Sequence, residues 1–267
     1  MRTFWYLRAK IFGRRAAFRV INPMPRLLCR ALALSLLVSL PACTTVPTAP
    51  KLDTSKTFTT VVVDAGHGGK DNGAYRRYGG AEKVATLDVA KRLDRKLRES
   101  QLKTVLTRSS DVFVPLDERV AIENSQKNCI FVSIHFNDSR RRGVHGFETY
   151  YHSPYSSELA NRIQAKLMTI PNSANRGVHT ANFRVLRLAT YPAVLVECGF
   201  LSNRHEGGEA RDFEYRELLA DRIAEAIVEQ RYGPGVYHAS AEATVEPRPP
   251  SEGPGGPGLA PATLRHD

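Results

Sequence analysis

Short apolar runs alternate with longer amphipathic segments through the middle of this chain of 267 residues, and this alternation restricts the fold more than any other feature. The short runs predict strands at residues 60–64, 103–107, 129–134, 147–151, 183–186 and 193–196. Apolar residues at helical spacing predict helices near residues 81–99, 116–126, 156–169 and 212–231. We therefore expect an α/β fold, a single domain with about six mostly parallel strands flanked by helices. Alternating apolar and polar residues at 147–151 favour an edge strand.

The positive charge of the chain is concentrated at its N-terminus. The formal net charge is +11, from 38 Lys and Arg residues against 27 Asp and Glu residues. Residues 1–42 contain seven Arg, one Lys and no acidic residue, which leaves 30 basic against 27 acidic residues in the remainder. The basic excess is typical of a targeting signal, and we expect no nucleic-acid partner.

The N-terminal segment has the pattern of an export signal. Residues 27–40 form an apolar run interrupted by Arg30, and they fall short of the roughly 20 apolar residues that span a bilayer. We therefore predict a signal peptide over residues 1–42. Translation that begins at Met24 gives a more compact signal peptide, so we predict that Met24 is the true start.

A cysteine follows this apolar run in a lipoprotein-like setting. Leu40 stands three positions before Cys43, and the small residue Ala42 directly precedes it. This pattern resembles the lipobox of bacterial lipoproteins, although Pro41 departs from its usual small or hydroxylated residue. The resemblance implies lipidation of Cys43 and a membrane-anchored protein in the bacterial periplasm or cell envelope. Ordinary cleavage near Ala42, which leaves a free cysteine, is the alternative.

Composition divides the rest of the chain into three parts. Residues 43–57 are rich in Thr, Pro and Lys, which is typical of a tether between a membrane and a folded body. Residues 58–233 contain the predicted strands and helices and form the predicted folded domain. Residues 234–267 are rich in Pro and Gly and contain few large apolar residues, so we expect a disordered tail.

Polar side chains stand at or just beyond the ends of three predicted strands. His67 and His135 follow apolar runs, and Glu197 follows the run at 193–196. Parallel strands bring such ends to one edge of a sheet, where ligand crevices form. One site can therefore hold all three side chains. Taken singly, a histidine in a glycine-rich turn or an acid that caps a turn has a purely structural explanation.

A further acid points toward the same edge. Glu82 opens a predicted helix and shares a helical stripe with Val89, Leu93 and Leu97, so its carboxylate faces the sheet. Two imidazoles and one carboxylate form the ligand set of catalytic zinc sites, which leave one position open for water. A further carboxylate can accept the proton of that water and deliver it to a leaving amine.

Four segments together resemble a known family. VVVDAGHGG, GAEK, VSIHFND and PAVLVECGFLSN are similar, in this order and spacing, to zinc-dependent N-acetylmuramoyl-L-alanine amidases of bacterial cell walls. The resemblance covers about residues 59–231 and implies a twisted, mostly parallel sheet flanked by helices. It implies Zn²⁺ bound by His67, Glu82 and His135, with Glu197 as the catalytic acid or base. The implied substrate is the peptidoglycan amide between the lactyl group of N-acetylmuramic acid and L-alanine, with Asn137 as a candidate substrate contact.

Two differences from the family pattern matter for function. Asp138 adds a carboxylate where the family often has a small residue, and this acid can alter substrate fit or metal binding. Only 61 residues separate His135 from Glu197, too few for the inserted autoinhibitory helix of some members. We therefore predict an enzyme that needs no obligatory activator. A zinc peptidase acting within the stem peptide and a non-catalytic peptidoglycan-binding lipoprotein remain the alternative functions.

Overall fold

The computed structural model describes residues 50–141 and 143–238. The predicted signal peptide, the predicted lipidation site Cys43 and residues 239–267 of the predicted tail lie outside these ranges. Within the described ranges, no helix has the length and apolar character that crossing a membrane requires.

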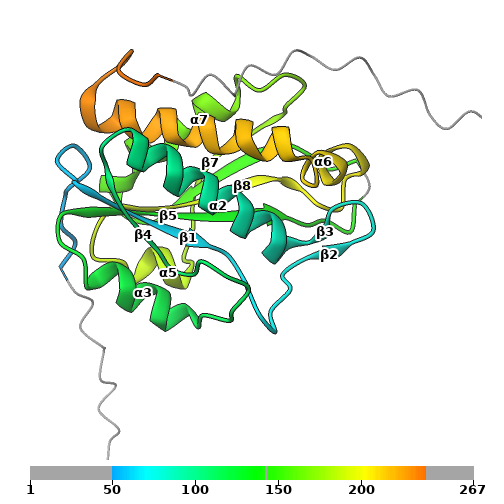
Figure 1. Ribbon diagram of the computed structural model, residues 1–267, viewed down its shortest axis with the longest axis horizontal. Coiled ribbons are helices and arrows are strands. Elements are labelled where there is room, and N and C mark those ends of the chain that lie inside the picture. The colour runs from blue at the N-terminus through cyan, green and yellow to red at the C-terminus, as the bar shows by residue number, and fades with distance from the viewer. Residues whose placement is uncertain (1–49, 142, 239–267) are drawn as a thin grey trace, which may run out of the picture. The chain divides into compact units, whose positions relative to one another are not determined.

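A six-stranded sheet with strand order β4-β1-β5-β8-β6-β7 forms the centre of the domain (Figure 1). Its strands are β1 (Thr60–Ala65), β4 (Lys103–Leu106), β5 (Cys129–Asn137), β6 (Phe147–Tyr151), β7 (Asn175–Thr180) and β8 (Ala193–Phe200). The strands β1, β4, β5 and β8 are parallel to one another. The strand β6 is antiparallel to β8 and parallel to β7, so β6 and β7 run opposite to the other four. The predicted α/β fold with a mostly parallel sheet is confirmed.

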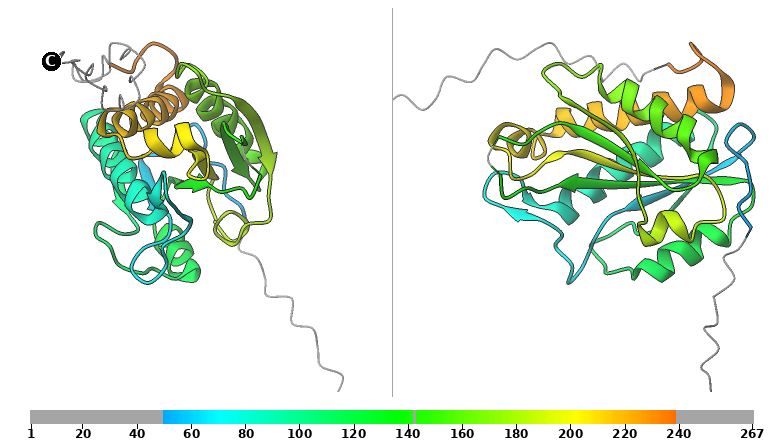
Figure 2. Two further views of the ribbon diagram at one scale, coloured as in Figure 1. Left: turned by 90° about the vertical axis from the view of Figure 1, so that its right-hand side faces the viewer. Right: turned by 180° about the vertical axis from the view of Figure 1, so that it is seen from behind.

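Helices cover the two faces of this sheet unequally (Figures 1 and 2). One face packs against three long helices, α2 (Glu82–Glu99), α4 (Ser157–Leu167) and α7 (Phe213–Tyr232). The opposite face packs against two shorter helices, α3 (Leu116–Asn124) and α5 (Arg184–Arg187). The remaining elements are a small hairpin of β2 (Tyr75–Arg76) and β3 (Gly80–Ala81), the 3-10 helix η1 (Pro154–Ser156) and α6 (Arg204–Glu209).

The alternation of side chains along β5 shows which residues lie on the face that the two shorter helices, α3 and α5, cover. Phe131, Ser133 and His135 point to the face under α3 and α5, because successive side chains in a strand point to opposite faces. The apolar cluster beneath these two helices includes Phe131 and, on β8, Leu195. Beyond that cluster the same face carries His135 and Glu197, which are neighbours in the β5–β8 register. We call this part of the sheet the open face.

Two strand predictions were wrong. Residues predicted as a strand at 183–186 begin with the cap of α5, and a short apolar pair such as Val185-Leu186 suits a strand or a helix equally. The sixth strand is instead β7, whose sequence NRGVHT lacks an apolar run. Because β7 pairs with β6, the strand at residues 147–151 lies inside the sheet and not at its edge.

Residues next to the predicted domain boundaries contact the folded body. The backbone N–H of Leu52 donates to the carbonyl oxygen of Thr190 at 2.9 Å, and the Thr54 hydroxyl donates to the carbonyl oxygen of Cys129 at 2.5 Å. On the C-terminal side, the Tyr237 hydroxyl donates to Asp221 at 2.8 Å. The packed body therefore includes the last residues of the segment predicted as a tether and the first residues of the predicted tail.

Candidate active site

His67 lies in the turn that follows β1, in a backbone conformation that few residues adopt. Its φ is 60°, in the left-handed region, where a non-glycine residue carries strain. The neighbouring Gly66 has no room for a side chain, because a Cβ there would lie 2.4 Å from the imidazole ring of His135. The turn thus brings the backbone of the His67 segment directly against the second histidine.

Two buried arginines hold this turn in place. Arg119, from α3, donates to the carbonyl oxygen of His67 at 2.6 Å and to the Asp64 carboxylate at 2.5 Å. Arg108 donates to the carbonyl oxygen of Gly66 at 2.7 Å and to that of Ala65 at 2.9 Å. Both arginines have only 3% of their surface exposed. Hydrogen bonds from charged donors therefore satisfy the carbonyl groups that the sharp turn leaves without strand partners.

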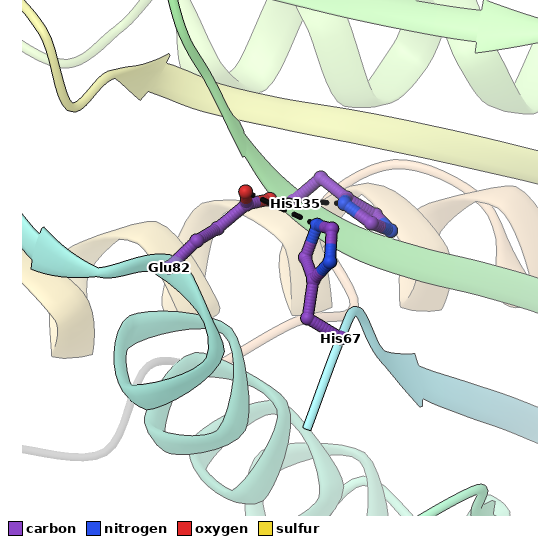
Figure 3. A group of neighbouring side chains, drawn as sticks. All are labelled: His67, Glu82 and His135. Carbon is purple, nitrogen blue, oxygen red and sulfur yellow. Dashed lines mark hydrogen bonds and ion pairs between the residues drawn. The ribbon is translucent and has the colours of Figure 1, made fainter. Parts of the chain in front are cut away.

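Glu82, the first residue of α2, joins the two histidines (Figure 3). Its Oε1 lies 3.0 Å from Nδ1 of His135, and its Oε2 lies 3.1 Å from Nε2 of His67. The carboxylate also accepts hydrogen bonds from the backbone N–H groups of Phe136, at 3.0 Å, and Ala74, at 2.9 Å. The inward orientation predicted from the helical stripe is what the structure shows, since Glu82 is 4% exposed.

These three side chains have the geometry of a metal site. One ligand atom from each of His67, Glu82 and His135 lies within 4.8 Å of the others, and no second group of this kind occurs among residues 50–141 and 143–238. The imidazole centroids are 4.9 Å apart and their planes are inclined by 76°. Asp71 lies 2.9 Å from Nδ1 of His67 and so orients the ring with Nε2 toward the cluster, as carboxylates bonded to metal-binding histidines do at zinc sites. This donor set fits Zn²⁺ with one position left open.

The same contacts shift the pKa values of the three groups. Burial disfavours the charged imidazole, yet the hydrogen bonds and charges of Glu82 and Asp71 raise the pKa of His67 to about 9. Glu82 also raises the pKa of His135 against the effect of burial. Burial opposes ionisation of Glu82, but the two histidines hold its pKa well below the usual range. Without metal, the His67 imidazole therefore retains a proton near neutral pH that a metal ion must displace.

Glu197 lies on the open face beside this cluster. In the strand register it lies directly opposite His135 on β5 and Glu148 on β6. Its Oε2 is buried and lacks a hydrogen-bond partner within the described part of the chain. Burial raises the pKa of Glu197 to about 7, His135 lowers it, and the nearby carboxylates of Glu82 and Glu148 raise it. A carboxyl group with this pKa can both accept and donate a proton near neutral pH.

Asn137 and Asp138 have partners within the protein. Asn137 donates from Nδ2 to Oε2 of Glu148 at 2.7 Å, which places its amide on the open face. Asp138 forms an ion pair with Arg76 of the β2–β3 hairpin and is not part of the three-residue metal group. The acid that departs from the family pattern is therefore balanced by a local cation.

Sequence reasoning missed several residues around the site. Asp71, Arg108 and Arg119 act on His67 or its turn, and their roles depend on contacts between separate loops and helices. Glu148 and Arg176 lie at the starts of β6 and β7, whereas the predicted site residues follow the ends of strands. The sequence of β6 did contain a signal for Glu148. An acid among the apolar residues of a strand in an α/β sheet is expected to be buried, and a buried acid needs a partner.

Sequence comparison gives the family to which this site belongs. Residues 61–229 match the sequence model of the Amidase_3 family, described as N-acetylmuramoyl-L-alanine amidase. The chain belongs to this amidase family. The match spans β1 to α7 and therefore includes every residue of the site described above.

Individual amidases are similar to this chain in sequence and in fold. N-acetylmuramoyl-L-alanine amidase LytC of Bacillus subtilis is 38% identical over 173 residues, which cover 63% of this chain but only 35% of LytC. The catalytic domain of the amidase CwlV from Bacillus (Paenibacillus) polymyxa is 38% identical, with a TM-score of 0.61 over 64% of this chain and 97% of that domain. CwlD of Clostridioides difficile, solved in complex with the GerS lipoprotein, is 30% identical, with a TM-score of 0.62 over 64% and 98% of the two chains. This chain thus spans about a third of LytC.

Proposed function

We propose that this protein hydrolyses the amide bond between N-acetylmuramic acid and L-alanine in peptidoglycan, with Zn²⁺ bound by His67, Glu82 and His135. The observation that carries the proposal is the convergence of these three ligand groups beside Glu197, whose buried Oε2 has no partner in the described residues. Membership of the amidase family supports the choice of substrate.

Each residue of the site has a separate task in this reaction. Zinc, when bound, supplies Lewis acidity that polarises the amide carbonyl and lowers the pKa of the attacking water. Glu197 accepts the proton of that water and delivers it to the departing amine of L-alanine, for which a pKa of about 7 is well suited. Asp71 keeps the ring of His67 in the orientation that binding requires. Asn137 is the candidate contact for a substrate amide.

The test of this function is a digest of purified peptidoglycan analysed by mass spectrometry. Cleavage at the proposed bond releases intact stem peptides that begin with a free alanine amine and leaves the sugars without peptide. A zinc peptidase acting within the stem would release shorter fragments and leave alanine attached to the sugar. A non-catalytic wall-binding protein would leave the digest unchanged while sedimenting with the wall, and either of these results would refute the proposal.

The same proposal places the enzyme in the cell envelope. The apolar run at residues 27–40 followed by Cys43 supports export and lipid anchoring, with purposes such as wall remodelling, daughter-cell separation or recycling. A Cys43→Ser variant should then appear in the soluble fraction of the envelope, whereas the wild type stays with the membrane. N-terminal mapping of the precursor tests whether translation begins at Met24.

We also expect activity without a partner protein. Between His135 and Glu197 the described residues form β6, η1, α4, β7 and α5, all of which belong to the sheet or its helical layers. Purified enzyme should therefore digest wall material by itself. CwlD was solved in complex with the GerS lipoprotein, so dependence on a partner protein is the alternative to test. If the purified enzyme is inactive until a partner is added, this expectation is wrong.

A further inference from the structure

An arginine on β7 presents part of its guanidinium group at the open face. Nε of Arg176 donates to Oε1 of Glu148 at 2.6 Å, and the guanidinium carbon lies 5.2 Å from the ring centroid of Phe200. The Arg176 side chain is 39% exposed, whereas that of Glu148 is 7% exposed. Across residues 50–141 and 143–238, the Nη groups of Arg176 have no hydrogen-bond acceptor. One edge of this cation is thus fixed by the protein, while the other edge faces solvent.

Glu148 connects this arginine to the reacting groups. Its carboxylate accepts hydrogen bonds from Asn137, at 2.7 Å, and from the Tyr150 hydroxyl, at 2.9 Å, in addition to Arg176. Glu148 is also the direct cross-strand neighbour of Glu197. Directly opposed side chains of antiparallel strands share one face and have Cβ atoms about 5 Å apart. Arg176 therefore lies two strands from Glu197, beyond Glu148, in the direction away from the metal group.

The order of these residues across the sheet matches the polarity of the bond to be cleaved. His135 lies on β5, Glu197 on β8, Glu148 on β6 and Arg176 on β7, which are consecutive strands of the sheet. The amide carbonyl belongs at the metal group and the departing amine belongs at Glu197. In this order, a peptide attached to that amine can extend over β6 toward Arg176.

We propose, on the basis of the proposed function, that Arg176 binds a carboxylate of the departing stem peptide and that Glu148 positions it. A planar guanidinium with two free nitrogen atoms suits a carboxylate, which it can bind through two parallel hydrogen bonds. Two strand spacings of about 5 Å each separate Glu197 from the strand of Arg176, and two stem residues of about 3.5 Å each span most of that distance. The long arginine side chain can cover the remainder, so this spacing selects the second residue of the stem, just beyond the alanine, as the source of the carboxylate.

Two synthetic muramoyl dipeptides test the proposal. Both carry N-acetylmuramoyl-L-alanine followed by a second residue whose α-carboxyl group is either a free acid or a carboxamide. The zinc-loaded wild type should cleave the acid with a kcat/KM about tenfold or more above that of the amide, mainly through a lower KM. Arg176→Gln should remove this preference, and Arg176→Lys should retain part of it. Arg98→Gln, which alters an exposed arginine on α2, is the matched control and should keep the preference in full.

The outcomes separate this inference from the function on which it rests. Equal kcat/KM values for the two dipeptides in the wild type, or a preference that persists in Arg176→Gln, overturn the inference while the amidase function stands. If the wild type cleaves neither dipeptide and also leaves purified peptidoglycan undigested, the proposed function fails. Calorimetric titration of Glu197→Gln with both dipeptides then decides the inference: tighter binding of the acid that disappears with Arg176→Gln supports it, and equal binding overturns it.

Discussion

The two halves of helix α2 each contribute to a buried group of charges, and the two groups differ in kind. At its start, Glu82 joins His67 and His135. In its second half, Lys96 lies 2.9 Å from Glu217 and 3.0 Å from Asp221 of α7. We call the second group the α2–α7 cluster, and it also includes Arg92 and Arg95, both paired with Glu217.

The difference lies in whether the positive charge is permanent. Arginine remains protonated at all physiological pH values, and the cations of the α2–α7 cluster lower the pKa of Glu217 to about 2, so the cluster ties two helices together with fixed charges. In the metal group, the positive charge includes a proton on the His67 imidazole, which a metal ion can replace. A titratable cluster next to a buried acid without a partner is therefore typical of a reaction site, whereas a cluster with fixed cations supports the fold.

The largest expected effect follows from removing the proton carrier. Glu197→Gln should lower kcat about 10²- to 10⁴-fold, because the amide cannot accept or deliver a proton. Zinc content and the thermal midpoint should stay at wild-type values, since Glu197 is not one of the three residues proposed to bind zinc. Glu217→Gln is the matched control, which should lower the thermal midpoint while the folded enzyme keeps its kcat. A Glu197→Gln variant with near-normal turnover would contradict the distinction between the two groups.

A substitution in the α2–α7 cluster should affect stability alone. Lys96→Met leaves the carboxylate of Asp221, which is 1% exposed, without its nearest cation. We expect a loss of about 3 kcal/mol in the free energy of unfolding, measured by urea denaturation of the zinc-loaded protein. The double variant Lys96→Met with Asp221→Leu should recover most of this loss. A loss below about 1 kcal/mol in the single variant would show that this ion pair is not a principal support of the fold.

A smaller effect is expected from the carboxylate that orients His67. Asp71→Asn should weaken zinc binding about tenfold, because the orienting partner of the metal-binding ring becomes neutral. Competition with a chelator of known affinity measures this change. Asp117→Asn, which removes an exposed acid paired with Arg184, is the control and should leave zinc affinity unchanged. If Asp71→Asn and the wild type bind zinc equally well, Asp71 supports the conformation of the turn and does not contribute to metal binding.

The smallest effect concerns pH. The pKa of His67, raised to about 9 in the metal-free protein, means that the folded state holds this proton more tightly than the unfolded state. This stabilisation is present in full below about pH 6.5 and is lost as the pH rises through 9. The thermal midpoint of the metal-free protein should therefore decrease as the pH rises from about 6.5 to 9. His67→Gln should make this decrease smaller. Identical pH profiles of the two proteins would contradict the assignment.

At the acidic end, the α2–α7 cluster should determine the response. Burial disfavours the Glu217 carboxylate, but Lys96, Arg92 and Arg95 lower the pKa of Glu217 to about 2. Its contribution to stability is present above about pH 4.5 and is lost as the pH falls toward 2. The same thermal measurement below pH 5, repeated on Glu217→Gln, should show a shallower loss in the variant.

The direction of each strand decided which site residues the sequence could reveal. His67, His135 and Glu197 follow apolar runs in parallel strands, so their common edge was predictable, and the helical stripe of α2 indicated Glu82. The strands β6 and β7 run the other way, so residues at their starts reach that edge. Glu148 and Arg176 were missed for this reason, and the polar sequence of β7 concealed that a strand was present at all.

The contacts that hold the His67 turn also lay beyond the reach of pattern reasoning. Arg108 and Arg119 are more than 40 residues from the carbonyl groups that they bind. Helical or strand periodicity describes neighbours within about two turns or a few strand positions, so it contains no information on such pairs. The signal peptide, the lipidated Cys43 and the zinc-binding roles remain predictions.

The left-handed conformation of His67 has a consequence for the speed of metal uptake. Arg119 binds the carbonyl oxygen of this residue, so the unfavourable backbone angle is already imposed when the domain folds. If a metal ion binds His67 as proposed, it meets a side chain that needs no rearrangement of the main chain, and only protons and water have to leave. Capture of the ion should accordingly be limited by deprotonation rather than by loop motion.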